Sequence, residues 1–260
     1  MKRMIVIILS LLLLSVDTAI AYPPVPLSTG APAQEAMIEW EPESVKLYEE
    51  TFFMFFEEAA ELTSLTLNME KMITFPYISG DLVSLTTISC PNVTEIDIEG
   101  VHDESVSISG LSALTSVSFP KLVEVGSPIS IEDCYLLSAL DLSSLTTVAQ
   151  LLNIYSFQGT SLNLSSLVTA DNMTIKSGDN LTSIDLSSLV PTSGGEYDFS
   201  WNALTAASVN AILARFVANA EFVSGTIDLS GGTNAAPTGQ GLTDVTTLRA
   251  RGVTVIVNGE

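Results

Sequence analysis

The stretch Ile175-Lys-Ser-Gly-Asp-Asn-Leu-Thr-Ser-Ile-Asp-Leu-Ser-Ser-Leu189 decides the fold, because its pattern recurs along the chain. Its central part, Leu181–Leu186, has counterparts at Leu62–Leu67, Leu85–Cys90, Leu114–Phe119 and Leu137–Leu142, and a shortened copy at Leu162–Leu164. The copies end at positions 67, 90, 119, 142, 164 and 186, so the steps between them are 23, 29, 23, 22 and 22 residues. A period of this length predicts a repeat solenoid, in which each unit buries its apolar side chains only by stacking on its neighbours.

A second apolar series precedes the first by ten to twelve residues and consists of Ile78, Ile108, Ile131, Ile154 and Ile175. Around this series polar and apolar residues alternate, as in Ile129-Ser-Ile131, which is typical of a strand with one buried face. The sequence therefore predicts a mainly β coil of 22–23 residues per turn, with two short strands and no helix between them. Equivalent strands of successive turns are expected to form parallel ladders on both faces. Pieces such as Leu186-Ser-Ser-Leu189 and Leu145-Thr-Thr-Val148 are expected to form the turns and inner corners.

The two ends of the chain depart from this repeat. One helical face of residues 35–61 and the residue after them collects five apolar side chains, those of Tyr48, Phe52, Phe55, Ala59 and Leu62. We interpret 35–61 as an acidic, amphipathic, helical N-terminal cap over the first repeat, with a partner-binding helix as the alternative. The solenoid is expected to occupy residues 62–200. Residues 201–260 are expected to form α/β closing repeats, the first helix being capped by Thr205.

The beginning of the chain is typical of an export signal. Residues 1–21 combine a short basic start, an apolar run at 5–14 and a small-x-small cleavage site at 19–21. An uncleaved anchor helix is the alternative, although the apolar run is short for a membrane span. Residues 22–34 follow as a Pro-rich linker. We therefore expect a secreted or cell-surface protein with no transmembrane segment beyond the signal peptide.

The charge balance excludes one class of partner. Nine Lys and Arg stand against 30 Asp and Glu, a formal net charge of −21. Removal of residues 1–21 leaves seven basic and 29 acidic residues, a net charge of −22. Such a chain repels phosphate backbones and anionic membrane surfaces, so nucleic-acid binding is not expected. The negative charge either keeps the protein soluble or serves cations or basic partners.

The two cysteines, Cys90 and Cys134, belong to different repeats about two units apart. Stacked strands are about 4.8 Å apart. The two residues should therefore be too distant for a disulfide. We expect two buried free thiols.

Catalytic and metal-binding patterns are scarce. His102 is the only histidine, and with Asp103 and Glu104 it is interpreted as part of a solvated loop, although such a pair could bind a metal or shuttle a proton. The nucleophile elbow, the phosphate-binding glycine loop and the zinc-protease helix motif do not occur. The sequence thus predicts a protein that is not an enzyme and has no cofactor or metal site. Ca²⁺ is a minor alternative, since carboxylates recur at unit spacing at Glu132, Asp133, Asp141, Asp179 and Asp185.

Ligand binding is expected on the outward sides of the strand ladders. The candidate residues are Glu132, Tyr155 and Lys176 beside the isoleucine series, and Asp141, Asn163 and Asp185 beside the other series. Among the outward positions only Tyr155 carries an aromatic ring, a surface on which a sugar or a side chain can stack. An ordinary solvated sheet face is the alternative.

Residues 62–258 resemble leucine-rich-repeat proteins. The units at 131–148 and 175–189 resemble the BspA-like repeats of bacterial surface proteins and the receptor L-domain repeats also seen in fungal cell-wall proteins. Residues 202–255 are similar to the closing repeat of many bacterial and phage leucine-rich-repeat chains. The resemblance implies adhesion, recognition or host-surface contact and no catalytic residues. The chain departs from BspA-like repeats by lacking their recurrent aromatic-then-Cys positions in most units.

Two functions follow as hypotheses. The first is an exported, non-enzymatic recognition or adhesion protein whose repeat-built surface binds a surface protein or glycan. The second is a structural component of a cell-surface layer or fibre that self-associates. The ligand and the oligomeric state do not follow from the sequence.

Overall fold

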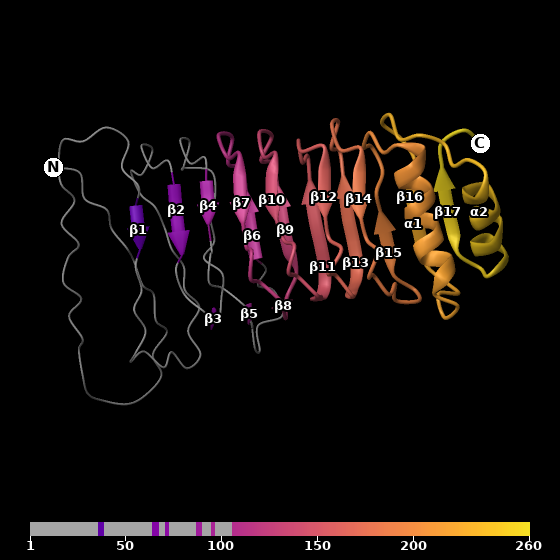
Figure 1. Cartoon of the computed structure of the whole chain (residues 1–260), viewed down its shortest axis with the longest axis horizontal. Helices are drawn as coiled ribbons and strands as arrows, with labels where there is room; N and C mark the ends of the chain where they lie inside the picture. Colours follow the sequence, from indigo (N-terminus) through magenta and orange to yellow (C-terminus); the bar gives the residue numbers. More distant parts are fainter. Residues whose placement is uncertain (1–35, 39–63, 68–70, 73–86, 90–94, 97–105) are drawn as a thin grey trace, which may run out of the picture.

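The chain folds into a mainly β solenoid in which the coils stack in chain order (Figure 1). The computed structural model describes residues 36–38, 64–67, 71–72, 87–89, 95–96 and 106–260. All strand pairs among these residues are parallel, because each coil repeats the path of the one before it. The predicted solenoid with parallel strand ladders is confirmed.

The larger sheet has ten strands in the order β17-β16-β15-β13-β11-β8-β5-β3, with β9 paired to β11 and β6 paired to β9. The strands are β3 (Lys71–Met72), β5 (Glu95–Ile96), β6 (Val106–Ser109), β8 (Glu124–Val125), β9 (Ile129–Glu132), β11 (Thr147–Tyr155), β13 (Thr169–Lys176), β15 (Glu196–Asp198), β16 (Thr226–Leu229) and β17 (Thr254–Val257). Along β6 and β9 every second residue is buried, as the alternation predicts.

The opposite face of the coil carries shorter strands. One sheet contains β1 (Ala36–Ile38), β2 (Ser64–Leu67), β4 (Thr87–Ser89), β7 (Ser116–Ser118) and β10 (Ala139–Asp141), and a separate pair contains β12 (Ser161–Asn163) and β14 (Ser183–Asp185). The ladder is therefore interrupted between β10 and β12. We call the side that carries these strands the short-strand face.

A continuous hydrophobic core fills the space between the two faces. It runs from Ile88 to Val257 and consists mainly of the inward-facing Leu, Ile and Val of each coil. Each apolar residue removed from water contributes about 1.5–3 kcal/mol. Because every coil contacts only its neighbours, this stabilisation is distributed along the stack.

One part of the predicted architecture differs from the structure in detail. The Leu-Thr-Thr-Val piece that ends at Val148 does not form only a corner: Thr147 and Val148 begin β11 and pair with Thr169 and Ala170. β-branched residues favour such extended backbone. A register shift after Val148 joins this segment to the strand predicted at Leu152–Ile154.

The segment 35–61, expected to form a helical cap, lies almost entirely outside the described residues. Within it the structure describes only residues 36–38, and these form β1, which pairs in parallel with β2. Pairing satisfies backbone groups of β2 that would otherwise lie at an open edge. The proposed helical face, the signal peptide at 1–21, the linker at 22–34, Cys90 and His102 lie outside the described residues.

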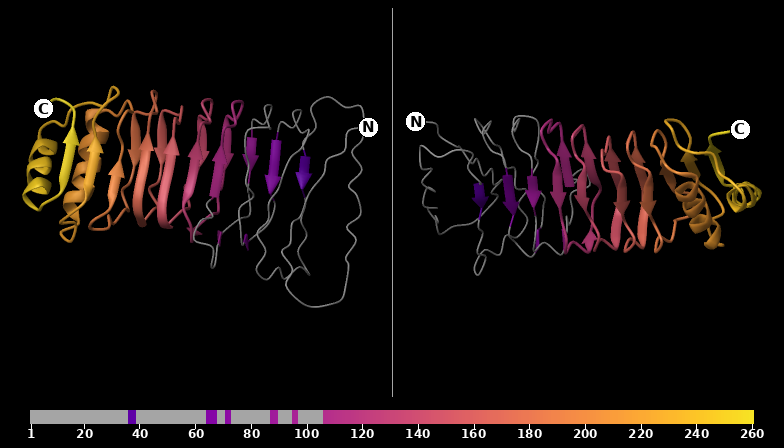
Figure 2. Two further views of the ribbon diagram at one scale, coloured as in Figure 1. Left: turned by 180° about the vertical axis from the view of Figure 1, so that it is seen from behind. Right: turned by 45° about the horizontal axis from the view of Figure 1, so that its top comes forward.

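After β15 the coils acquire helices. Helix α1 (Ala206–Ala218) precedes β16, and α2 (Gln240–Ala250) precedes β17. The predicted N-cap residue of α1, Thr205, is confirmed, since its hydroxyl accepts a hydrogen bond from the Ser208 amide at 3.3 Å. Figures 1 and 2 place α1 beside β14 on the short-strand face, where the next short strand of the ladder would lie.

Buried side-chain amides tie the closing coils together. Asn202 is 1% exposed; its Nδ2 donates to the carbonyls of Ile175 (2.7 Å) and Phe199 (2.9 Å), and its Oδ1 accepts from the Gly178 amide (2.9 Å). One coil later Asn234, also buried, donates to the carbonyls of Phe199 and Leu229. These amides satisfy backbone groups at a coil corner, where no strand partner is available.

Candidate functional site

Three of the six predicted site residues lie side by side on the larger sheet. Tyr155 of β11 is opposite Lys176 of β13, and the pairing of Ile131 with Ile154 places Glu132 opposite Tyr155. All three side chains are half-buried. The predicted outward row of Glu132, Tyr155 and Lys176 is therefore present as a geometric feature.

The charged groups of this row are already engaged with their neighbours. The Glu132 carboxylate accepts hydrogen bonds from the Ser130 hydroxyl and the Asn153 amide. Lys176 Nζ lies 2.9 Å from Asp198 Oδ2. This bond raises the pKa of the Lys176 ammonium above its ordinary value. The row is thus a network of satisfied polar groups, which leaves few of them free for a ligand.

Two opposing effects act on the pKa of the Asp198 carboxyl. Burial raises its pKa, but hydrogen bonds from Ser200 and Lys176 outweigh burial and hold the pKa below its ordinary value. Asp198 is therefore ionised at neutral pH and serves as the partner of Lys176. Nothing in this geometry poises either group for proton transfer.

The other three predicted residues do not form one row. Asn163 of β12 is opposite Asp185 of β14, whereas Asp141 lies in β10, across the interruption in the short-strand face. Each side-chain Oδ1 accepts a hydrogen bond at 3.0–3.1 Å from the backbone amide two residues further on, at Ser143, Ser165 and Ser187. These three residues therefore stabilise turns, a local role typical of Asp and Asn.

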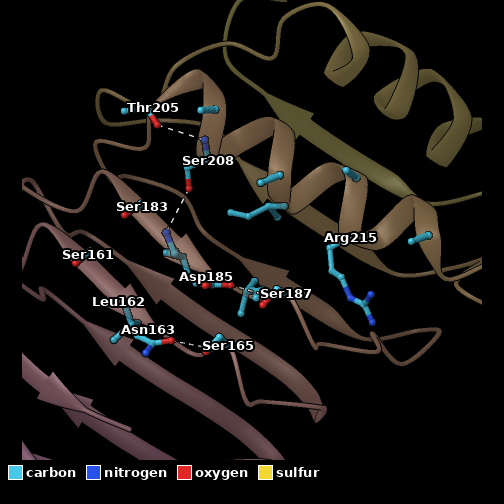
Figure 3. Close-up of a pocket in the computed structure, with 17 residues that line it drawn as sticks. Ser161, Leu162, Asn163, Ser165, Ser183, Asp185, Ser187, Thr205, Ser208 and Arg215 are labelled. Carbon is cyan, nitrogen blue, oxygen red and sulfur yellow. Dashed lines mark hydrogen bonds between the residues drawn. The ribbon is translucent and has the colours of Figure 1, made fainter. Parts of the chain in front are cut away.

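A groove of about 770 Å³ lies where the short-strand face meets α1 (Figure 3). We call it the β14–α1 groove, lined by Ser161, Leu162, Asn163, Ser165, Ser183, Ile184, Asp185, Leu186, Ser187, Thr205, Ala207, Ser208, Ala211, Ile212, Ala214, Arg215 and Ala218. It exists because the ladder of short strands ends at β14 and a helix takes the next place. Asn163 and Asp185, both exposed, are the predicted residues that it brings together.

The helical wall of the groove is smooth and is anchored to the strand wall. Ala207, Ala211, Ala214 and Ala218 line one side of α1 and leave room beside the strands. Ser208 is buried, and its hydroxyl accepts a hydrogen bond from the Ile184 amide at 3.3 Å, so the helix takes the place of a strand partner.

Arg215 attaches the C-terminal half of α1 to the strand wall. Its guanidinium donates hydrogen bonds to the backbone carbonyls of Ser188, at 3.3 Å, and Leu189. These bonds join the C-terminal half of α1 to the loop after β14. The groove is therefore held from both ends and is expected to keep its width without a ligand.

The sequence reasoning missed the helical wall and the most exposed aromatic residues. The alanines at steps of 4, 3 and 4 residues were the available signal for a smooth helical face. Trp201 and Tyr135, with 62% and 57% of their surface exposed, project more than the half-buried Tyr155. Tyr155 is therefore not the principal exposed aromatic residue of the part of the chain that the structure describes.

The structure also corrects the proposed carboxylate ladder for Ca²⁺. Asp141 and Asp185 lie on separate sheets, and within residues 106–260 and the shorter described segments no three His, Cys, Asp or Glu side chains come close enough to hold a metal ion. In the same part of the chain, no helix is both long enough and apolar enough to cross a membrane.

Cys134 is a buried free thiol, as expected. Burial raises its pKa above the ordinary value for a thiol. Its sulfur lies 3.3 Å from the Glu132 carbonyl and 3.9 Å from that of Ile108, so the thiol faces backbone groups of its own coil and the preceding one. Such a thiol is a packing element and a poor nucleophile.

Comparisons with protein-family models, with curated proteins and with solved structures find no match to the chain. The structure shows a mainly β parallel-strand solenoid with a groove of mixed polar and apolar lining beside α1.

Proposed function

We propose that this chain is an exported, non-enzymatic recognition or adhesion protein that binds a surface glycan or protein segment in the β14–α1 groove. The observation that carries the proposal is the groove itself, whose volume of about 770 Å³ falls in the range of ligand sites. Export and a place at the cell surface rest on the signal-like residues 1–21.

The lining of the groove favours an extended ligand that has both polar and apolar parts. Five of its residues are serines, and Asn163 adds an amide, so hydroxyl and amide groups face an apolar alanine wall. Asp185 and Arg215 are the only charged residues among those lining the groove, and Arg215 is occupied by backbone carbonyls. A single free carboxylate does not make an acid–base pair, which supports binding in place of catalysis.

The asparagine corners support a relationship to leucine-rich repeats. Tyr197-Asp-Phe-Ser-Trp-Asn-Ala-Leu204 fits the pattern L-x-L-x-x-N-x-L, with Asn202 at the buried amide position. Three residues after Ile131, Cys134 takes the position that the pattern gives to Asn or Cys, and its sulfur faces the Ile108 carbonyl much as Asn202 faces that of Ile175. We infer a leucine-rich-repeat-like identity from this equivalence.

Filling the groove tests the proposal. We expect Ala211→Trp to lower affinity at least tenfold for at least one ligand that the purified protein selects from a glycan and cell-surface protein panel, because the indole would occupy the space beside Asp185. Ala211 is exposed, so the fold should persist. The control is Ala250→Trp, which places the same ring on an exposed position of α2 outside the groove. Equal loss in both variants, or none in either, contradicts the proposal.

The alternative, a self-associating structural protein, requires an accessible end. β17 is the last strand of the larger sheet, and its outer edge is partly covered. Arg249 of α2 donates to the Val255 carbonyl from Nε at 3.2 Å and from Nη2 at 2.6 Å, and it pairs with the Glu260 carboxylate at 2.6 Å. Charged side chains over an edge strand oppose strand addition. This arrangement favours recognition over end-to-end assembly.

Removing the edge cover should promote association. We expect Arg249→Ala to increase the weight-average mass at a given concentration, measured by light scattering, because the outer carbonyl of Val255 becomes free to pair with a second copy. Arg251→Ala removes the same charge, but its guanidinium contacts the carbonyls of Val217 and Asn219, not the edge. If wild-type protein forms long ordered assemblies with Arg249 in place, the structural alternative is favoured instead.

A further inference from the structure

A row of left-handed backbone positions follows the strands of the larger sheet, one in each coil from residue 106 onward. The residues are Gly110 (φ 69°), Asp133 (53°), Ser156 (63°), Ser177 (59°), Trp201 (58°), Gly231 (71°) and Gly259 (89°). Glycine adopts this conformation freely, and small polar residues tolerate it, whereas a bulky side chain is strained there. Six of the seven positions follow this rule, and Trp201 alone breaks it.

Burial does not account for the tryptophan. Trp201 is 62% exposed, the largest fraction among the exposed large hydrophobic residues of the described chain. A residue that is both strained and exposed is not retained for stability, and strain of this kind is concentrated at functional sites. The position therefore points to a role for the indole outside the fold.

The indole is nevertheless held in a fixed place. A Cβ on Gly231 would lie 2.9 Å from both Cε2 and Nε1 of Trp201, so the ring sits directly against the glycine of the next coil. Nε1 donates to no other group in the described part of the chain. The indole ring is therefore fixed against Gly231, is largely exposed, and has an N–H donor without a partner in the described part of the chain.

The surroundings of this ring are polar. On the neighbouring coils the equivalent positions are Ser177 and Gly231, and Ser230 precedes the glycine. A protein hot spot needs an apolar cluster that excludes water around its anchor. A sugar ring needs one flat apolar surface and nearby hydrogen-bonding groups, which an indole with a free N–H provides. Hence these features favour a sugar.

We propose that Trp201 is a sugar-binding platform on which a neutral or amino pyranose stacks, with the indole N–H donating to a sugar hydroxyl. The net charge of −21 disfavours uronic and sialic acids and favours uncharged or basic sugars. Trp201 is not among the residues that line the β14–α1 groove. This site therefore goes beyond the groove and does not depend on it.

The test compares wild type with Trp201→Asn on an array of immobilised neutral, amino and acidic oligosaccharides. We expect wild type to bind at least one neutral or amino oligosaccharide and Trp201→Asn to bind it at least tenfold more weakly. Ala211→Trp should bind it as wild type does, because the groove is a separate site. Titration of a Trp40→Phe variant, in which Trp201 is the remaining tryptophan, should give a saturable change in indole fluorescence.

The stability of Trp201→Asn distinguishes a binding role from a structural one. Asparagine tolerates left-handed backbone, so the variant should melt at or above the temperature of wild type. A lower melting temperature would make Trp201 a structural residue and overturn the proposal. Unchanged sugar binding in Trp201→Asn would also overturn the proposal. So would an array on which Trp201→Asn weakens the binding of acidic sugars alone, or of basic peptides alone where these are added as a comparison.

Discussion

Asn202→Ala is expected to cost about 2–6 kcal/mol of unfolding free energy, because it leaves two buried backbone groups without the side-chain partner that Asn202 supplies, at about 1–3 kcal/mol each. The groups are the carbonyl of Ile175 and the amide of Gly178, whereas the carbonyl of Phe199 keeps its hydrogen bond from Asn234. Water cannot replace the missing side chain readily, since the position is 1% exposed. The coil corner between the larger sheet and α1 should open first.

Denaturant unfolding followed by circular dichroism measures this effect. The matched control is Asn180→Ala, since Asn180 is exposed and donates only to the Gln158 side chain at 3.2 Å. Its loss should change stability by less than about 0.5 kcal/mol. Equal and small effects of the two substitutions would mean that the buried amide does not hold the corner together.

The second large effect is expected for Phe216→Ala. Phe216 is fully buried on α1 and packs edge-to-face against Tyr197, at a ring-centroid distance of 4.8 Å, and against Phe222, at 5.1 Å. Truncating a buried phenylalanine costs about 3–5 kcal/mol, because apolar burial is removed and a cavity is left behind. The absence of the two edge-to-face ring interactions adds to that cost.

Calorimetry of Phe216→Ala should show a lower melting temperature, and ligand binding in the β14–α1 groove should weaken at temperatures below the transition. The reason is that Phe216 holds the helix whose alanines form one wall of the groove. Leu242→Ala is the control, because Leu242 is an apolar helix residue with 52% exposure. A Phe216→Ala protein with unchanged stability would refute the assignment of this cluster as the anchor of α1.

The strand ladders were predictable because each position repeats once per coil. The alternation around Ile131 and Ile154 places them in register, and the structure pairs these two residues. Two features could not be predicted from the pattern of a single repeat. Thr147 and Val148 resemble the turn pieces of other units, yet β-branching and pairing with the next coil make them strand. The interruption between β10 and β12 separates residues that one series had joined.

The candidate site was predictable only in part. The row of Glu132, Tyr155 and Lys176 follows from strand register, but register does not tell which polar groups satisfy one another. The groove depends on where α1 packs. Helical spacing identifies the buried side of α1 and leaves the neighbour of its exposed side undetermined.

Trp201 illustrates a further limit of the sequence. The sequence Phe199-Ser-Trp-Asn202 contains no signal that predicts left-handed backbone at the tryptophan. That conformation depends on the coil corner and on the contact with the glycine of the next coil. Comparison of equivalent positions across coils makes the exception visible. Such exceptions to a local rule are expected at functional positions.

Hydrogen–deuterium exchange of the protein with and without its best panel ligand tests the central claim, that recognition occurs in the β14–α1 groove, most directly. The account predicts added protection of backbone amides in β14 and in the first turns of α1, from Ser183 to Asp185 and from Ala207 to Ala211. Protection confined to the outward row of Glu132, Tyr155 and Lys176, with no change beside α1, would contradict it.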